Sequence, residues 1–159
     1  MNAFEFHCPT KIICGEGALH KLPVKIADRG ATKPLIVTDS NLMKLGIAEQ
    51  VFAPLKEADV NYSLYDRVPP DSSLNVVNEV AELYKEEKCD GWIALGGGSV
   101  IDTAKGAAAS VSVGEKDFTD LQGSEVLQDE LDPLIAIPTT AGTGSEVTLV
   151  AVVADTEHH

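Results

Sequence analysis

The sequence is poor in basic residues, and this shortage excludes several classes of protein. It has 12 lysines and arginines against 25 aspartates and glutamates, which gives a formal net charge of −13 at neutral pH. A chain with this charge repels polyanions, so neither nucleic-acid binding nor attachment to an anionic membrane through a basic face is expected. Residues 115–132 alone contain seven acids and one lysine. We interpret that segment as a solvated connector rather than as an acidic docking site.

Cysteines are also few, and long apolar runs are missing from the sequence. Cys8, Cys14 and Cys89 are an odd, scattered set, unlike a disulfide framework, and no two have the C-x-x-C spacing of a zinc site. We expect reduced thiols in a cytoplasmic protein. The first residues lack the basic and then apolar pattern of a secretory signal, and no apolar run approaches the ~20 residues that span a bilayer.

The rest of the composition is typical of a globular α/β chain. Its 159 residues, 44% of them hydrophobic, are enough for one domain, 1–159, with a buried core. Short apolar segments alternate with segments of helical periodicity, which predicts a doubly wound, mostly parallel, Rossmann-like sheet with helices on both faces. The expected strands are 34–38, 60–65, 92–95, 134–137 and 148–154, after an N-terminal β-hairpin or two edge strands around Phe4, Phe6 and 11–14; the expected helices are 18–28, 43–58 with a kink or division at Pro54, 74–88 and 100–111.

The strongest local signal is Gly96-Gly97-Gly98-Ser99, between a buried strand and a helix. Three glycines let the backbone turn sharply and let an anion approach without Cβ atoms in the way. Ser99 is placed to cap the helix, and Asp102, three residues later, completes a capping-box-like pair. The first-turn amides would then face a ligand, for which a diphosphate is the natural chemistry. A turn without a ligand needs only one glycine, so phosphate binding is favoured, although the spacing matches neither G-x-G-x-x-G nor a Walker A loop.

Two further segments follow strands at the same edge of the expected sheet. Asp39 comes directly after strand 34–38, where a carboxylate can accept hydrogen bonds from ribose hydroxyls and repel a 2′-phosphate. Taken alone, an aspartate there is more often a helix cap. Residues 138–146 provide four hydroxyl side chains and two glycines without a bulky residue. Ligands of open α/β sheets lie beyond the carboxyl ends of the strands, so a ligand contact is favoured over an ordinary surface loop.

Together these motifs resemble those of the iron-containing (group III) alcohol dehydrogenases. The shared stretches are 15–19, 37–39, 96–105 and 138–146, in this order along essentially the whole chain. The resemblance implies a dinucleotide-binding domain followed by an all-helical domain, with NAD in the cleft between them. It places Asp39 at the adenosine ribose, which fits members that prefer NAD, and Asp102 near the nicotinamide end. The expected cofactor-binding residues are Asp39, Gly96, Gly97, Gly98, Ser99, Asp102, Thr139, Thr140 and Thr143.

The same resemblance implies a divalent metal, usually iron and sometimes zinc, held by one aspartate and three histidines of the helical domain. That domain is absent from this sequence. Its histidines are His7, His20, His158 and His159, and none is expected to bind metal. We therefore expect residues 1–159 to contain no catalytic residue and no metal ligand, to bind dinucleotide weakly and to show no turnover.

Several alternatives stay open from the sequence. The complete enzyme implied by the resemblance transfers hydride between an alcohol and an aldehyde or ketone, but its substrate is not specified by these residues. The chain could also be a stand-alone, non-catalytic nucleotide-binding module, or part of a glycerol-dehydrogenase-like member of the same superfamily. A homodimer that shares N-terminal strands is a further alternative.

Overall fold

A parallel four-stranded sheet forms the centre of the protein. The computed structural model describes residues 8, 10–114, 127 and 130–154. The strand order is β2-β1-β3-β4, and every neighbouring pair is parallel. The chain moves outward from β1 to β2 and then returns to place β3 on the other side of β1, so the strand order reverses between β1 and β3. Such a reversal opens a crevice beyond the carboxyl ends of the strands. The strands are β1 (Pro34–Val37), β2 (Ser63–Tyr65), β3 (Gly91–Gly96) and β4 (Leu134–Pro138).

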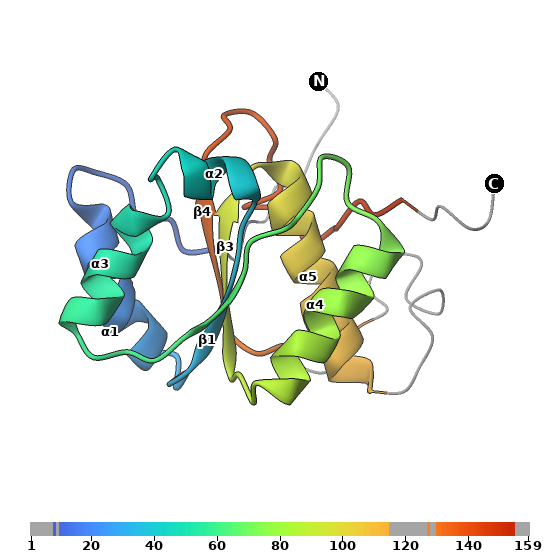
Figure 1. The fold of residues 1–159 in the computed structure, drawn as a ribbon, viewed down its shortest axis with the longest axis horizontal. Coiled ribbons are helices and arrows are strands. Elements are labelled where there is room, and N and C mark those ends of the chain that lie inside the picture. Colours follow the sequence, from blue (N-terminus) through green and yellow to red (C-terminus); the bar gives the residue numbers. More distant parts are fainter. Residues whose placement is uncertain (1–7, 9, 115–126, 128–129, 155–159) are drawn as a thin grey trace, which may run out of the picture.

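Helices cover both faces of this sheet (Figure 1). This is the doubly wound α/β arrangement that the alternation of segments predicted. One face carries η1 (Ala18–Lys21), α1 (Leu22–Ala27) and α3 (Glu49–Glu57), the other carries α4 (Leu74–Glu86) and α5 (Gly98–Val113), and α2 (Ser40–Lys44) lies at the carboxyl edge. Within the described residues, no helix has the length and apolar character needed to cross a membrane.

The core consists of two layers, one on each face of the sheet. Successive strand side chains point to opposite faces, so Leu35 and Trp92 pack toward α4 and α5 while Ile36 and Ile93 pack toward α1 and α3. All four are essentially inaccessible to solvent. Burial of an apolar side chain of this size contributes about 1.5–3 kcal/mol, so β1 and β3 hold the fold together from its centre.

A carboxylate ties the central strands together at their amino ends. Asp90, just before β3, accepts hydrogen bonds from the Thr32 amide at 2.8 and 2.9 Å, the Thr32 hydroxyl at 2.6 Å and the Lys33 amide at 2.7 Å. Burial alone would raise the pKa of Asp90, but the hydrogen bonds from Thr32 and Lys33 outweigh it and hold the pKa below its ordinary value. The ionised carboxylate therefore stabilises the folded state.

The predicted helix 43–58 is divided, but the predicted place of the division, Pro54, is wrong. Two helices, α2 and α3, replace it, and the break falls at Gly46, whose φ of 71° is in the left-handed region that favours glycine. Pro54 lies inside α3 and is buried. In a helix of nine residues its ring removes a single backbone hydrogen bond, and burial of the ring offsets part of that loss.

The outermost expected strands are also different in the structure. Residues 11–14 form no strand, while Phe4 and Phe6 lie outside the described residues. The expected strand 148–154 is wrong, because this segment has only one isolated parallel bridge, between Ser73 and Ala154. The carbonyls of Thr148 and Val150 accept hydrogen bonds from the Lys105 ammonium instead of from a neighbouring strand.

Candidate functional site

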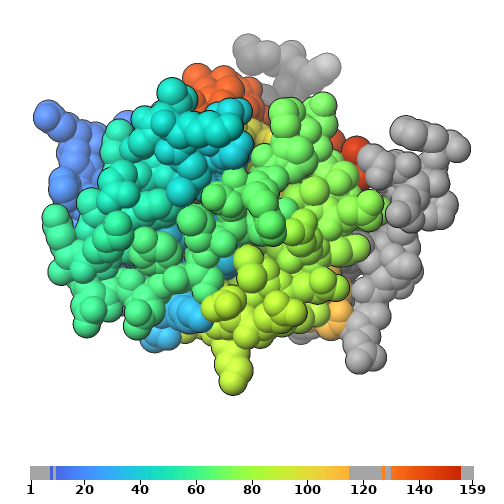
Figure 2. Space-filling model, viewed as in Figure 1, coloured from blue at the N-terminus to red at the C-terminus, as the bar shows by residue number. Residues whose placement is uncertain are grey.

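The three segments with predicted ligand contacts meet at the carboxyl edge of the sheet. The buried Thr38 hydroxyl donates to the Leu95 carbonyl at 2.8 Å and ties the end of β1 to β3. The Thr139 amide donates to the Gly96 carbonyl at 3.0 Å and ties the end of β4 to β3. Figures 1 and 2 show the segment after β4, in orange, and α2, in teal, at the same upper edge of the molecule. The site predicted from three separate motifs is therefore one region, at the point where the strand order reverses.

Close contacts, rather than unusual backbone angles, explain the glycines of the turn. None of Gly96, Gly97 and Gly98 has a positive φ, so the backbone angles of the turn do not themselves require glycine. A Cβ on Gly96 would lie 2.5 Å from the Val100 Cγ2, and a Cβ on Gly97 would lie 2.9 Å from the Thr140 Oγ1. Gly96 is thus required for packing beneath the turn. Gly97 lets the threonine-rich segment, residues 139–150, and any ligand approach the backbone.

The helix after this turn begins without a side-chain cap. Gly97 is the N-cap residue of α5, and no side chain of the described residues accepts from its first amides. The predicted capping box is therefore wrong, because Ser99 and Asp102 already lie inside the helix, and the Ser99 hydroxyl instead accepts from the Asp71 amide at 3.3 Å. First-turn amides have no acceptor within a helix. In α5, which has 16 residues, they point out from the positive end of the helix dipole, as in anion-binding sites.

Asp102 is a buried carboxylate with a free acceptor. The residue is 7% exposed, and its Oδ1 has no hydrogen-bond partner in the part of the chain that the structure describes. Buried polar atoms almost always have a partner, because desolvation without one is unfavourable. Asp102 follows the glycine turn on α5 by one helical turn. This position fits a ligand that brings a hydrogen-bond donor.

Asp39 is a helix cap in the structure. Its Oδ1 accepts from the Asn41 amide at 2.8 Å and the Leu42 amide at 3.1 Å, at the start of α2. Among the described residues, none donates to Oδ2 of this half-buried side chain. The cap therefore occupies one oxygen, and the second is available for ribose hydroxyls at the end of β1.

The threonine-rich segment lies across the start of α5. Thr139, Thr140 and Thr143 are all exposed, with Thr140 beside Gly97. The Thr143 hydroxyl donates to a Glu146 carboxylate oxygen at 3.2 Å and accepts from the Ser145 amide at 3.4 Å. These hydroxyls form a second polar wall facing the glycine turn.

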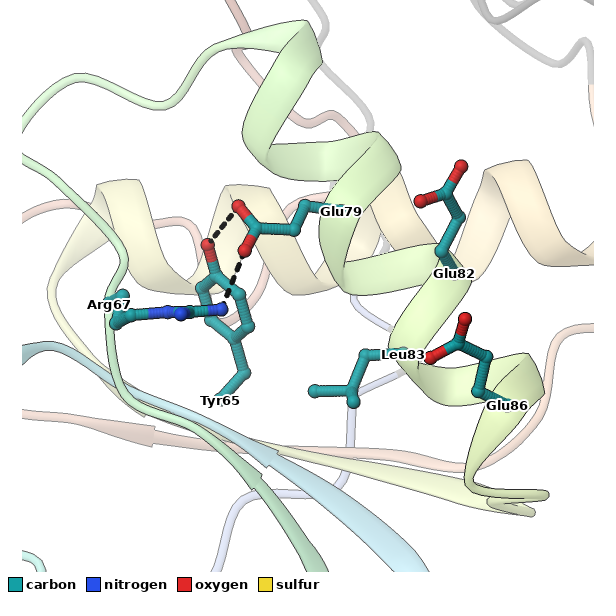
Figure 3. A pocket seen from close by; sticks show the side chains of 6 residues that line it. All are labelled: Tyr65, Arg67, Glu79, Glu82, Leu83 and Glu86. Atoms are coloured by element: carbon teal, nitrogen blue, oxygen red, sulfur yellow. Dashed lines mark hydrogen bonds and ion pairs between the residues drawn. The ribbon is translucent and has the colours of Figure 1, made fainter.

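Away from this site, a hollow between β2 and α4 (Figure 3) is lined by residues that do not suit a dinucleotide. Its volume of about 180 Å³ is below the about 300–1,000 Å³ of typical ligand pockets. Arg67 is already paired with Glu79 at 2.6 Å, and Glu79 also accepts from the Tyr65 hydroxyl at 2.9 Å. Burial first, and then Glu79, raise the pKa of Tyr65 to about 12. The further lining residues Glu82 and Glu86 would repel a diphosphate.

The described residues do not fit a divalent metal. They bring together no group of three or more histidine, cysteine, aspartate or glutamate side chains that could hold one. His20 is exposed, and the other histidines, His7, His158 and His159, lie outside the described residues. The three cysteines are free, and burial raises the pKa of the Cys89 thiol, which makes it a poor nucleophile. No chemical step is therefore assigned to a metal or to a nucleophile of these residues.

Comparisons with known proteins identify the family of this chain. A family model described as iron-containing alcohol dehydrogenase matches residues 9–159. The choline dehydrogenase of Bacillus subtilis (strain 168) is 44% identical over 154 residues, which cover 96% of this chain and 38% of that protein. The NAD-dependent methanol dehydrogenase of Bacillus methanolicus is 36% identical over 150 residues, which cover 94% of this chain and 39% of that protein.

Solved structures give the same result. The crystal structure of a 1,3-propanediol oxidoreductase matches with a TM-score of 0.91 and 32% identity, over 98% of this chain and 41% of the other. An alcohol dehydrogenase from Oenococcus oeni matches with a TM-score of 0.89 and 41% identity, over 99% and 41%. The chain spans about two fifths of the length of these relatives. By the family match and by these likenesses, the chain belongs to the iron-containing alcohol dehydrogenase family.

Proposed function

We propose that this chain is the dinucleotide-binding part of an NAD-dependent, iron-dependent alcohol dehydrogenase. The complete enzyme would transfer hydride between a small alcohol and NAD. The observation that carries the proposal is the uncapped start of α5, which lies beyond β3 where the strand order reverses. The named activities of the relatives, on methanol, choline and 1,3-propanediol, support an alcohol as substrate.

Different residues of the site bind different parts of the cofactor. Gly96 supports the turn, and the amides of Gly97, Gly98 and Ser99 bind the diphosphate. Because the two glycines have no Cβ, the diphosphate oxygens can reach the backbone. The hydroxyls of Thr139, Thr140 and Thr143 line the opposite wall. Asp39 accepts from the adenosine ribose, and Asp102 accepts a hydrogen bond at the nicotinamide end. When bound, NAD supplies the hydride acceptor, while these residues hold and orient it.

Binding to this chain alone is expected to be weak. Hydrogen bonds to a charged group each contribute about 1.5–3 kcal/mol, but association costs at least about 4 kcal/mol, and the surrounding chain carries a net charge of −13. The described residues offer contacts only from the carboxyl edge of the sheet. We expect a Kd between about 0.1 and 1 mM, which corresponds to about −4 to −5.5 kcal/mol.

Calorimetric titration with NAD and NADP tests the proposal. The wild-type chain should prefer NAD, because the Asp39 carboxylate repels a 2′-phosphate. Asp39→Asn keeps an N-cap side chain but removes the charge, so it should relax the preference without destabilising α2. Asp39→Gly should relax it as well. Equal affinities of the wild-type chain for NAD and NADP would remove Asp39 from the ribose site, and no binding of either would refute the proposed function.

Turnover by the 159-residue chain is a second test. We expect no NADH from ethanol or 1,2-propanediol, because the described residues supply no metal cluster to polarise the alcohol oxygen. The absorbance of NADH is the measurement. Sustained NAD-dependent oxidation by the purified chain would contradict the proposal that these residues bind the cofactor without activating the alcohol.

A further inference from the structure

Lys105 on α5 makes three hydrogen bonds to a segment far along the chain. Its ammonium donates to the Thr148 carbonyl at 2.8 Å, the Val150 carbonyl at 3.0 Å and the Thr148 hydroxyl at 3.2 Å. An ammonium has three protons, so these acceptors use its full donor capacity. Lys105 therefore has no donor left for a direct contact with a ligand unless this arrangement opens.

This lysine differs from the paired lysines of the described surface. Lys25, Lys33 and Lys56 each pair with a carboxylate, and Lys33 also donates to the main-chain carbonyl of the same partner, Glu87, at 2.6 Å. The half-buried Lys105 is absent from the ion pairs of the described residues and bonds to main-chain carbonyls instead. Burial lowers the pKa of Lys105, while the charges of Asp102 and Glu146 act in the opposite direction. Fixing a lysine side chain also costs conformational entropy, so these hydrogen bonds must offset both losses.

The threonine-rich segment is consequently held at both of its ends. At its start, the Thr139 amide bonds to the Gly96 carbonyl at 3.0 Å. At its end, Thr148 and Val150 are bound by Lys105. Between these points the segment passes so close to the glycine turn that a Cβ on Gly97 would lie 2.9 Å from the Thr140 Oγ1.

We propose that Lys105 is a positioning residue that holds the threonine-rich segment against the glycine turn, so that both walls of the dinucleotide site are in place before NAD arrives. This inference rests on the proposed function, since it concerns how the same site is kept in shape. Without Lys105, the next anchor along the chain is the bridge between Ser73 and Ala154, so the residues before it would sample more conformations and ordering them would weaken binding. The sequence motif contains Lys105, but its role depends on residues more than 40 positions away, which the sequence did not indicate.

The test compares Lys105→Met, Lys105→Arg and the control Lys85→Met in the 159-residue chain. Lys85 is an exposed lysine on α4, so its replacement removes the same charge away from the site. Hydrogen exchange of the free chain should show the amides of Val147 and Thr148, which both donate to the Gly144 carbonyl at 3.1 Å, exchanging about tenfold faster in Lys105→Met, because this turn opens more often without the bonds from Lys105. Lys105→Arg should restore most of the protection, and Lys85→Met should match the wild type.

Calorimetry with NAD completes the experiment. Lys105→Met should bind NAD about tenfold more weakly than the wild type, a difference of 1.4 kcal/mol, with recovery in Lys105→Arg. Unchanged exchange of the Val147 and Thr148 amides, or faster exchange with unchanged NAD affinity, would overturn the inference. If Lys105→Met does not fold, Lys105→Gln, whose shorter arm does not reach the same carbonyls, replaces it in the same comparison. A wild-type chain that fails to bind NAD refutes the proposed function, whereas the exchange data still decide whether Lys105 holds the segment.

Discussion

A methyl group added at Gly97 should separate ligand binding from folding. The new Cβ would lie 2.9 Å from the Thr140 Oγ1 and 3.4 Å from the Thr140 Cβ. Thr140 is exposed and belongs to a loop, so it can move by a few tenths of an ångström. Gly97 has φ −81° and ψ −166°, which an alanine also adopts, so backbone strain is absent. We expect Gly97→Ala to change the free energy of unfolding by less than about 1 kcal/mol.

The same methyl group should cost much of the affinity for NAD. Diphosphate oxygens must come within about 2.9 Å of an amide nitrogen to form hydrogen bonds, and a Cβ at the N-cap residue covers that approach. The loss should be at least about tenfold in Kd, or about 1.4 kcal/mol. Adding Thr140→Ala relieves the contact with the loop but leaves the methyl group over the amides, so it should not restore binding.

Gly96→Ala is the matched control, because its added methyl group points into the core. That Cβ would lie 2.5 Å from the Cγ2 and 2.6 Å from the Cβ of Val100, a buried, β-branched helical residue that cannot turn away. Overpacking of this kind costs about 1–3 kcal/mol or more, which lowers Tm by about 2–4 °C per kcal/mol.

Urea unfolding and calorimetry measure the two effects separately. The fluorescence of Trp92, the single tryptophan, 1% exposed, reports unfolding, and titration reports NAD affinity. Gly97→Ala should lose binding with near-normal stability, and Gly96→Ala should lose stability. A Gly97→Ala chain that binds NAD as tightly as the wild type would refute the assignment of the diphosphate to this turn.

Three further changes test other parts of the account. Asp102→Asn should weaken NAD binding in calorimetric titration, because an amide oxygen accepts a hydrogen bond less strongly than a carboxylate; unchanged affinity would contradict this. Asp90→Asn should cost about 1–2 kcal/mol at pH 7, since the charge-assisted bonds from Thr32 are weakened. The pKa of Asp90 is lowered on folding, so the stabilisation by its carboxylate is complete above the ordinary pKa of 3.8 and is lost as pH falls through the lower folded pKa. The two proteins should therefore converge in stability in acid, and a constant difference down to pH 2 would argue against this. Gly46→Ala, at φ 71°, should cost about 1–2 kcal/mol by thermal unfolding, and no change would place the helix break elsewhere.

The buried strands were predictable from the sequence, because burial leaves a direct pattern. Strands β1, β3 and β4 are uninterrupted apolar runs, as expected for parallel strands covered by helices. Strand β2 is shorter than predicted, since the Val60 amide bonds back to the Leu55 carbonyl at 2.9 Å and belongs to the end of α3. Local pattern therefore located the elements, while their ends depended on hydrogen bonds that it does not specify.

The sequence indicated the segments that meet at the candidate site, but not the contacts that several of their residues make. The reason for Gly97 is Thr140, which lies 43 positions later, and only the fold brings the two together. Ser99 was expected to cap α5, yet its hydroxyl contacts the loop at Asp71. The burial of Asp102 and its free oxygen likewise follow from packing. Such roles depend on long-range contacts, so local spacing predicts the place of a site better than its geometry.

The most direct test of the central claim is amide NMR of the isotope-labelled chain during titration with NAD. We expect the largest shifts on the amides of Gly97, Gly98 and Ser99, with smaller shifts in the threonine-rich segment and at Asp39. Residues of the hollow between β2 and α4 should not respond. Saturable shifts elsewhere, with the glycine turn unchanged, would contradict the account.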